Sequence, residues 1–580
     1  MVVQDQNAAA AGAVAPRPGR YALFEQLRAD GVRFMFGNPG TVEQGFLDTI
    51  SDFPDISYVL ALQETIAVAM ADGYARAARR PAVVQLHSGV GLGNGVGMLY
   101  QARRGHAPLV VVAGESGVMY DAMDAQMAAD LVGIARPVTK WATRVLHPTS
   151  LLRVIRRAIK IASTPPMGPV FVALPMDVLD DATTEAAVPT SVPVTRVRPD
   201  AADVENAASH LARARHPLVI FGDGVAFSGA QRELVEVAEV LGAEVWGADC
   251  SEISIPTSHV QYRGQLGHMF GSHSGPILAA ADAVLVVGTY LLPEVFPNLD
   301  SIFAPGTAVV HIDLDAYEIA KNFPVDLGIV ADPALTLKAL AAALGTAMRP
   351  EDVAAAAERR AAARARRTEE DREAGAADAA TWEQTPMRPA RFMSELAKRL
   401  DPRSVIFDEA LTSSPELVRY LSFDQPGGYY QTRGGSLGVG IPGALGAKLA
   451  HPDRTVIGFT GDGGSMYTIQ ALWTAAHHGI GAKFVICNNG SYKLLKTNIQ
   501  QYWRERGISE HDFPASFDLG RPEIRFDLLA QSLGVDAIRV DRPEQVGPAI
   551  DKALGTEGPF LIDLVLSDEI PGHAHIRCGQ

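Results

Sequence analysis

Two motifs rich in oxygen donors lie toward the carboxyl end of this 580-residue chain. Asp462 stands between two glycines in Gly461-Asp462-Gly463, and Asn489 is the second residue of an Asn pair further along. A carboxylate, an amide oxygen and a nearby backbone carbonyl make half of an octahedral oxygen shell, which suits Mg²⁺. Diphosphate oxygens and a water would complete that shell. The two motifs therefore predict a magnesium site that holds a diphosphate.

The residues around the motifs predict a strand–helix–strand unit that would position them. The apolar runs 456–460 and 484–487 suit buried parallel strands, and 467–477 has helical spacing. Gly463 and Gly464 permit a sharp turn after the first strand. Because parallel strands end at one edge of a sheet, where such folds bind ligands, both motifs should meet there.

A second copy of the glycine–aspartate–glycine motif, Gly222-Asp223-Gly224, provides an internal comparison. It also follows a strand-like run, but the position matching Asn489 is Cys250 and no Asn pair is nearby. This motif alone is typical of a turn. We therefore interpret Asp223 as a loop residue and Asp462 as a metal ligand.

Two further side chains have the chemistry for proton transfer. Glu64 begins a predicted helix in Y-V-L-A-L-Q-E-T-I, among apolar neighbours. It is either an N-terminal dipole partner or a carboxylate whose proton affinity burial raises. His87 follows an apolar strand and precedes Ser88 and a glycine-rich turn. It is either a hydrogen-bonded core residue or a group that transfers protons at neutral pH.

Composition excludes several classes of function. A net charge of −15 argues against nucleic acid or an anionic membrane as partner. No apolar run approaches the roughly 20 residues of a membrane helix. The three cysteines show neither metal spacing nor a disulfide framework, so a cytoplasmic location is expected. The first residues lack a basic start and a true apolar core, which favours a disordered tail over a signal peptide.

Three blocks alternate strand-like and helix-like stretches, which predicts an α/β protein with three doubly wound parallel-sheet domains. For the C-terminal tail, both ordering over a neighbouring segment and fraying remain open. The predicted boundaries are a disordered N-terminal tail 1–19, a first domain 20–186, a central domain 200–345, a charged Ala-rich linker 346–385, a third domain 386–567 and a C-terminal tail 568–580.

Several segments resemble thiamine diphosphate-dependent enzymes of the benzoylformate decarboxylase kind. These segments are F-M-F-G-N-P-G-T, L-A-L-Q-E, A-D-G-Y-A-R-A and Q-L-H-S-G-V-G-L-G-N-G, together with the two metal motifs. The likeness extends over nearly the whole chain. It implies pyrimidine-binding, central and diphosphate-binding domains, with thiamine diphosphate and Mg²⁺ as cofactors. It also implies a homodimer with shared active sites, within a homotetramer.

The resemblance carries roles over to particular residues. Glu64 matches the partner of the pyrimidine N1′ atom, His87 a proton relay, and Thr41 a hydroxyl that contacts the substrate carboxylate. The implied metal ligands are Asp462, Asn489 and the backbone carbonyl of Ser491. The implied cofactor contacts are Glu64, Thr412, Gly435, Leu437, Gly463, Gly464, Ser465 and Asn489.

The pattern departs from benzoylformate decarboxylases in the substrate pocket. Their second active-site histidine aligns with about Val295, and two pocket phenylalanines fall on Gln431 and Asn498. Leu494 and Leu495 keep the pocket partly apolar. The loss of an acid–base group and two aromatic walls weakens the case for an aromatic substrate and favours a polar or larger acyl group.

The resemblance predicts non-oxidative decarboxylation of a 2-oxo acid through an enamine to an aldehyde. The alternative is a carboligase or lyase of the acetolactate synthase, aldehyde lyase or 2-hydroxyacyl-CoA lyase kind, which makes or breaks a C–C bond. A non-catalytic homologue is disfavoured by intact Glu64, Asp462 and Asn489. The alternating glycines 89–97 contain no G-x-G-x-x-G, which argues against nicotinamide. For the central domain, a cofactor-free role is the default, with FAD or a nucleotide left open.

Overall fold

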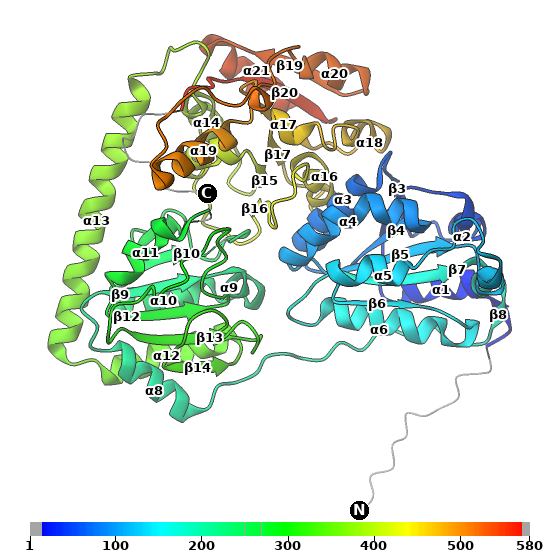
Figure 1. Ribbon diagram of the computed structural model, residues 1–580, viewed down its shortest axis with the longest axis horizontal. Helices are drawn as coiled ribbons and strands as arrows, with labels where there is room; N and C mark the ends of the chain where they lie inside the picture. The colour runs from blue at the N-terminus through cyan, green and yellow to red at the C-terminus, as the bar shows by residue number, and fades with distance from the viewer. Residues whose placement is uncertain (1–13, 249, 268, 571–580) are drawn as a thin grey trace, which may run out of the picture. The chain divides into compact units, whose positions relative to one another are not determined.

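The computed structural model describes residues 14–248, 250–267 and 269–570, and the chain forms two compact units, Met1–Pro193 and Val194–Gln580. Parallel sheets flanked by helices form the first unit and both halves of the second (Figure 1). This confirms the predicted α/β class with three parallel-sheet domains. Ordered structure begins before residue 20, because the strand β1 (Arg17–Pro18) pairs with β8 (Ala182–Thr183).

The first unit is built on a parallel sheet with strand order β3-β2-β4-β5-β7-β6. After β2 the chain adds β3 on one side and then returns to add β4 on the other. The carboxyl ends of β2 and β4 therefore flank a switch point, where parallel sheets bind ligands. The strands are β2 Phe34–Gly37, β3 Ser57–Leu60, β4 Ala82–His87, β5 Leu109–Glu115, β6 Trp141–Arg144 and β7 Val170–Pro175.

Helices cover this sheet with their apolar sides. In α6 the buried positions Leu152, Ile155 and Ile159 recur every three or four residues, which turns its arginines outward. Helix α3 begins at Glu64, where the sequence predicts a helix start, and packs against α4. The helices are α1 Gly19–Ala29, α2 Gln44–Ile50, α3 Glu64–Ala78, α4 Ser88–Arg104, α5 Leu131–Ala135, α6 Leu151–Ser163 and α7 Met176–Asp180.

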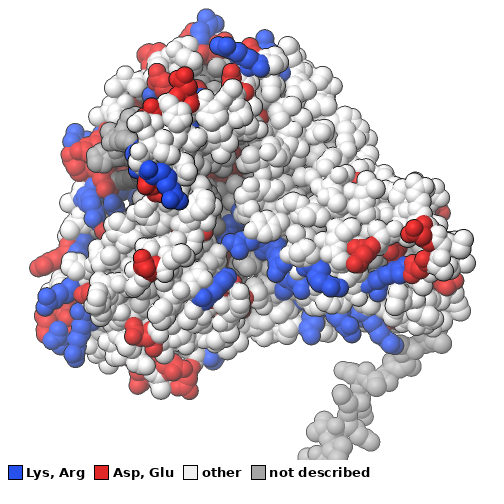
Figure 2. Space-filling view, in the orientation of Figure 1, with Lys and Arg blue, Asp and Glu red and all other residues white. Residues whose placement is uncertain are grey.

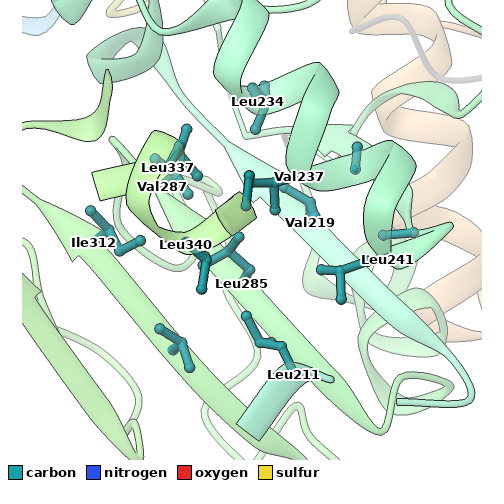
Figure 3. Close-up of a cluster of buried hydrophobic side chains, with 14 of the residues drawn as sticks. Leu211, Val219, Leu234, Val237, Leu241, Leu285, Val287, Ile312, Leu337 and Leu340 are labelled. Atoms are coloured by element: carbon teal, nitrogen blue, oxygen red, sulfur yellow. The ribbon is translucent and has the colours of Figure 1, made fainter. Parts of the chain in front are cut away.

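The central sheet of the second unit has the order β11-β10-β9-β12-β13-β14. Figure 3 shows Val219, Leu285 and Ile312 from its strands packed against Val237 of α10 and Leu340 of α12. The near-continuous apolar runs of β9 and β12 suit strands covered on both faces. The elements are α8 Ala201–Leu211, β9 Pro217–Phe221, α9 Asp223–Ser228, α10 Gln231–Leu241, β10 Glu244–Gly247, β11 Tyr262–Gln265, α11 Gly271–Ala279, β12 Ala283–Val287, β13 Ala308–Asp313, β14 Leu327–Val330 and α12 Pro333–Ala347.

The charged, Ala-rich stretch forms the long helix α13, Pro350–Ala379. Ala356 and Ala363 are its buried residues, and ion pairs such as Arg367 with Asp371 lie along the helix. Acidic and basic side chains are interspersed along the edge where α13 lies (Figure 2). None of the helices in the described residues combines the length and apolar surface that crossing a membrane requires.

The third sheet has the order β16-β15-β17-β18-β20-β19, so its switch point lies between β15 and β17. The helix expected over 467–477 begins only at Ala471, since residues 466–470 form turns, and the Thr468 hydroxyl there donates to the Gly438 carbonyl at 2.7 Å. The strands are β15 Val405–Glu409, β16 Tyr429–Gln431, β17 Val456–Gly461, β18 Lys483–Asn488, β19 Asp536–Val540 and β20 Phe560–Val565. The helices are α14 Pro389–Ala397, α15 Ser414–Tyr420, α16 Gly440–Ala450, α17 Asp462–Ser465, α18 Ala471–His477, α19 Lys493–Arg506, α20 Phe526–Ser532 and α21 Val546–Gly555.

Candidate active site

Glu64 is buried beside the switch point of the first unit and is held by two neutral amides. Asn38 Nδ2 donates to its Oε1 at 3.3 Å, and Asn94 Nδ2 donates to Oε2 at 3.0 Å. The helix-capping role falls instead to Gln63, whose side chain accepts the Thr65 amide at 2.6 Å. Glu64 is therefore a desolvated, oriented carboxylate, which suits a hydrogen-bonding role toward a ligand.

His87, the last residue of β4, is paired with a buried glutamate that sequence analysis did not identify. His87 Nδ1 lies 2.9 Å from Glu43 Oε2, and Glu43 Oε1 accepts the Gly114 amide at 3.0 Å. Burial raises the pKa of Glu43, although its hydrogen bonds to His87 and Gly114 oppose that shift. Because Glu43 engages Nδ1, Nε2 is the His87 atom left to exchange a proton with a ligand.

Thr41, Glu64 and His87 gather around two glycines. A Cβ atom at Gly40 would lie 2.0 Å from the His87 ring, so the ring packs directly on this backbone. A Cβ atom at Gly91 would lie 2.9 Å from Glu64 Oε1 and 3.3 Å from His87 Cβ. Thr41 follows Gly40 and is exposed. The first unit thus brings together its three residues with predicted catalytic roles.

Asp462 directly follows β17 at the switch point of the third sheet. Its Oδ1 accepts the Gly463 amide at 2.8 Å, while its buried Oδ2 has no hydrogen-bond partner among the described residues. Burial raises the pKa of Asp462 to about 6, and backbone amides, first that of Gly463, oppose that shift. A buried, unpaired carboxylate oxygen is costly unless a cation compensates it.

The two asparagines at the end of β18 have different surroundings. Asn488 Nδ2 donates to the buried Asp563 at 2.9 Å, which ties this side chain into the sheet. Asn489 Oδ1 accepts the Ser491 amide at 3.0 Å, which folds the following residues into a tight loop. Because β17 and β18 are parallel neighbours, this loop lies beside Asp462. The second unit therefore brings the three predicted metal ligands together.

A second buried glutamate, Glu409 at the end of β15, anchors the turn that carries Leu437. Its Oε1 accepts the Gly438 amide at 2.5 Å, and its Oε2 accepts the Gly440 amide at 2.6 Å. Gly435 and Gly438 have φ angles of 76° and 91°, which side chains other than glycine rarely adopt. Glu409 thereby positions the half-buried Leu437 and the Gly435 carbonyl, both predicted cofactor contacts.

We expect Glu409 to make the apoprotein less stable as the pH rises. Burial raises its pKa to about 7, above the ordinary value of 4.5. Because the folded state favours the protonated carboxyl, its contribution is fully present below pH 4.5 and is lost as the pH rises through about 7. Glu409→Gln cannot ionise, so its melting temperature should fall less between pH 6 and pH 8 than that of the wild type. Thermal denaturation without added metal measures how the melting temperature changes with pH in both proteins. An equal change in the two would contradict this assignment.

The remaining predicted residues of the second unit lie on several elements. Leu494 and Asn498 of α19 are one turn apart on the same helix face, and Leu495 is 41% exposed. Val295 lies in the segment that follows β12 of the central sheet and is 53% exposed. The positions are Thr412 in the turn Leu411–Ser413, Gln431 at the end of β16, Gly463, Gly464 and Ser465 in α17, Leu494, Leu495 and Asn498 in α19, and Val295 after β12.

In the second glycine–aspartate–glycine motif, the aspartate is fully hydrogen-bonded within the protein and backbone packs against the glycine. Asp223 Oδ1 accepts the Ser251 amide at 2.8 Å and the Glu252 amide at 3.1 Å, and Oδ2 accepts the Ser251 hydroxyl at 2.7 Å. A Cβ atom at Gly224 would lie 2.6 Å from Gly288 Cα. The backbone after β9 and the backbone after β12 therefore pack directly on each other and fill the switch point of the central sheet. Asp223 is thus a structural residue, although it begins the helix α9 and does not lie in the loop that the sequence predicted.

The residues around Asp462 fit a hard divalent cation. They offer carboxylate, amide and backbone carbonyl oxygens, and the buried Asp462 Oδ2 has no other partner in the described part of the chain. No group of three or more His, Cys, Asp and Glu residues that could hold a metal occurs among the described residues. A cation at Asp462 would therefore need further oxygens from a ligand, such as those of a diphosphate.

The chain matches the three family models of thiamine pyrophosphate enzymes. The N-terminal TPP binding domain matches residues 17–134, the central domain 204–340 and the C-terminal TPP binding domain 412–564. The last match contains Asp462, Asn489 and Ser491, and the first contains Glu64 and His87.

Individual relatives are similar to this chain over nearly its full length. Benzoylformate decarboxylase of Pseudomonas aeruginosa is 33% identical over 552 residues, covering 94% of this chain and 98% of that protein. A probable acetolactate synthase large subunit of Methanocaldococcus jannaschii is 27% identical, covering 94% and 92%. The crystal structure of benzoylformate decarboxylase from Polynucleobacter necessarius superposes with a TM-score of 0.81 at 25% identity, covering 96% and 99%. The chain belongs to the thiamine pyrophosphate enzyme family.

Proposed function

We propose that this protein is a thiamine diphosphate- and Mg²⁺-dependent enzyme that decarboxylates a 2-oxo acid to an aldehyde. The observation that carries this proposal is that each unit of the chain holds one set of the expected residues. One set is the desolvated Glu64 beside the His87–Glu43 pair, and the other is the buried Asp462 Oδ2 beside Asn489. The similarity to benzoylformate decarboxylases supports the choice of reaction.

When bound, thiamine diphosphate supplies a nucleophilic carbon and a cationic ring that accepts the electrons of the broken C–C bond. In our proposal Asp462, Asn489 and the Ser491 carbonyl hold Mg²⁺, and the α17 backbone receives the diphosphate. Glu64 holds the pyrimidine ring by a hydrogen bond, with its carboxylate oriented by Asn38 and Asn94. This chain thus supplies binding and orientation at one end of the cofactor and proton control at the other.

His87 is proposed to move a proton at its Nε2 atom next to the reacting carbon. Glu43 orients the ring through Nδ1, and Gly40 allows the ring to lie flat against the backbone. Thr41 adds a hydroxyl near the same place, which suits the substrate carboxylate. His87 ends β4 and the other groups follow β2, so they lie at the switch point between these strands, where parallel sheets bind ligands.

We expect His87→Ala to lower turnover roughly 100-fold, because a positioned acid–base group contributes about 10²–10⁴-fold. The measurement is kcat with saturating cofactor and substrate. His87→Gln is a useful companion variant, since it keeps hydrogen bonding without the acid–base function. An unchanged kcat with a raised KM would instead make His87 a contact for substrate binding.

A carboligase or lyase is the second candidate. The similarity to an acetolactate synthase large subunit supports it. The resemblance also aligns a pocket histidine of the decarboxylases with about Val295, where this chain has no histidine. The polar side chains of Gln431 and Asn498 favour a polar or larger acyl group in either case. The alternating glycines lie in the helix α4 and not in the turn that the sequence predicted. They contain no G-x-G-x-x-G, so no nicotinamide is proposed.

We also propose a homodimer, and by resemblance a homotetramer, in which Glu64 of one subunit completes the diphosphate site of another. This assembly is what the resemblance to thiamine diphosphate-dependent enzymes implies, and Glu64 and Asp462 belong to different units of the chain. Sedimentation with and without cofactor tests this assembly.

Product analysis tests the proposed reaction. Purified protein with thiamine diphosphate and Mg²⁺ is incubated with a 2-oxo acid, alone and with a second aldehyde, and the products are identified by NMR. We expect one aldehyde for each 2-oxo acid consumed. A 2-hydroxy ketone or a 2-hydroxy-2-acyl acid as the main product would establish the carboligase instead.

A further inference from the structure

The chain that follows β20 runs along the loop that carries the proposed metal ligands. Val565 is paired with Asn488, and the next amide, that of Leu566, donates to the Asn488 carbonyl at 2.8 Å. The Ser567 amide then donates to the Met387 carbonyl at 2.8 Å. The segment therefore stays beside the Asn489–Ser491 loop after the sheet ends.

Asp568 is the residue of this segment that contacts the loop. Its Oδ1 accepts the Ser491 hydroxyl, and its Oδ2 accepts the Lys496 ammonium from the first turns of α19. Lys493 Nζ of the same helix donates to the Ser567 carbonyl at 3.0 Å. Hydrogen bonds to a carboxylate are stronger than those between neutral groups. Asp568 therefore ties the C-terminal segment to both the metal loop and α19.

The Ser491 hydroxyl has two acceptors within reach and only one hydrogen to donate. One is Asp568 Oδ1, and the other is Asn489 Oδ1 at 3.3 Å. The carboxylate is the stronger acceptor, so the hydrogen is directed to Asp568. Asn489 Oδ1 then accepts only the Ser491 amide at 3.0 Å from this residue, which leaves a lone pair for a cation.

We infer that Asp568 is a positioning residue for the Mg²⁺ site. It draws the Ser491 hydroxyl away from Asn489 Oδ1 and fixes the loop that carries both proposed ligands beside Asp462. Hydrogen-bond partners of metal ligands orient the ligands and tune metal affinity in this way. The inference rests on the proposed metal site, and it extends that site to a residue 77 positions after Ser491 in the chain.

Equilibrium dialysis of the full-length protein tests this role without relying on activity. Retained thiamine diphosphate is measured against MgCl₂ concentration for the wild type, Asp568→Ala and Asp568→Asn. We expect the Mg²⁺ concentration for half-maximal retention to rise roughly 10- to 100-fold in Asp568→Ala, the usual effect of losing such a partner. Asp568→Asn keeps shape and one acceptor but no charge, so a smaller rise is expected.

Glu569→Gln is the matched control, because Glu569 is an acidic residue of the same segment whose partner is Arg388, at 3.0 Å. The Mg²⁺ concentration that gives half-maximal retention (the midpoint) should stay within about twofold of the wild-type value. Ser491→Ala keeps the backbone carbonyl and removes the hydroxyl. In that background Asp568→Ala should have little further effect, since residues that act through one contact are not additive.

The outcomes separate this inference from the proposed function. A Mg²⁺-dependent wild type with an unchanged midpoint in Asp568→Ala would overturn the role of Asp568 and leave the metal site standing. Full additivity in the Ser491→Ala background would also overturn it. A wild type that retains cofactor equally well in EDTA would overturn the metal site itself and this inference with it. If Asp568→Ala does not fold, the Asp568→Asn midpoint decides between the same outcomes.

Discussion

Glu64→Gln is expected to bind thiamine diphosphate and yet lose turnover by roughly 10²–10⁴-fold or more, the contribution of a positioned acid–base group. Glutamine has nearly the shape of glutamate and keeps one of the two contacts with Asn38 and Asn94, while the asparagine that faces its new amide nitrogen must flip so that its oxygen accepts. It cannot take up the proton that a carboxylate shares with the pyrimidine ring. The measurement is kcat for a 2-oxo acid, taken with cofactor retention on the same sample.

The retention measurement makes this result interpretable. Cofactor bound as in the wild type, together with lost turnover, places Glu64 in the chemical step. Turnover equal to that of the wild type would remove Glu64 from the mechanism. Loss of both properties would assign Glu64 to binding, in conflict with our account.

Asp462→Ala is expected to abolish Mg²⁺-dependent retention of thiamine diphosphate. The variant removes the buried oxygen that has no hydrogen-bond partner in the described residues. Losing a metal ligand should lower Mg²⁺ affinity by more than losing the hydrogen-bond partner of a ligand, which lowers it roughly 10- to 100-fold. Dialysis against MgCl₂ or EDTA measures the effect, and Asp462→Asn should behave similarly because it removes the charge.

The chain supplies a matched control for this experiment in its other glycine–aspartate–glycine motif. Asp223→Asn changes the same residue type at the corresponding position of the central sheet. There the amides of Ser251 and Glu252 already donate hydrogen bonds to the carboxylate. Its cofactor retention should follow the wild type, even if its thermal stability falls. Full retention in Asp462→Ala would refute the metal assignment.

Much of the metal-side geometry could be predicted because it is local in sequence. The strands β17 and β18 are apolar runs, each followed by a turn that contains glycine. Parallel neighbours must end at the same edge of their sheet. Placing Asp462 next to Asn489 therefore required only the order of two strands. The start of α3 at Glu64 followed from local signals in the same way.

The partners of these residues could not be predicted, because they depend on packing between distant segments. Glu43 meets His87 from 44 positions away, and Asp568 meets Ser491 from 77 positions away. Glu409 anchors a glycine turn 29 and 31 positions later in the chain. The available signals were weak: a glutamate shortly after a glycine turn for Glu43, and an acid ending a buried apolar strand for Glu409. Neither pattern distinguishes a functional carboxylate from a solvated one.

The most direct test of the central claim is CO₂ release by the protein loaded with thiamine diphosphate and Mg²⁺. The substrates are benzoylformate, pyruvate, and branched and polar 2-oxo acids, with Glu64→Gln holoprotein as the control. Our account predicts release from at least one acid with a stoichiometric aldehyde, and loss of that release in Glu64→Gln or in EDTA. No release from any acid in the panel, with cofactor demonstrably bound, would contradict the decarboxylase and favour the carboligase or lyase.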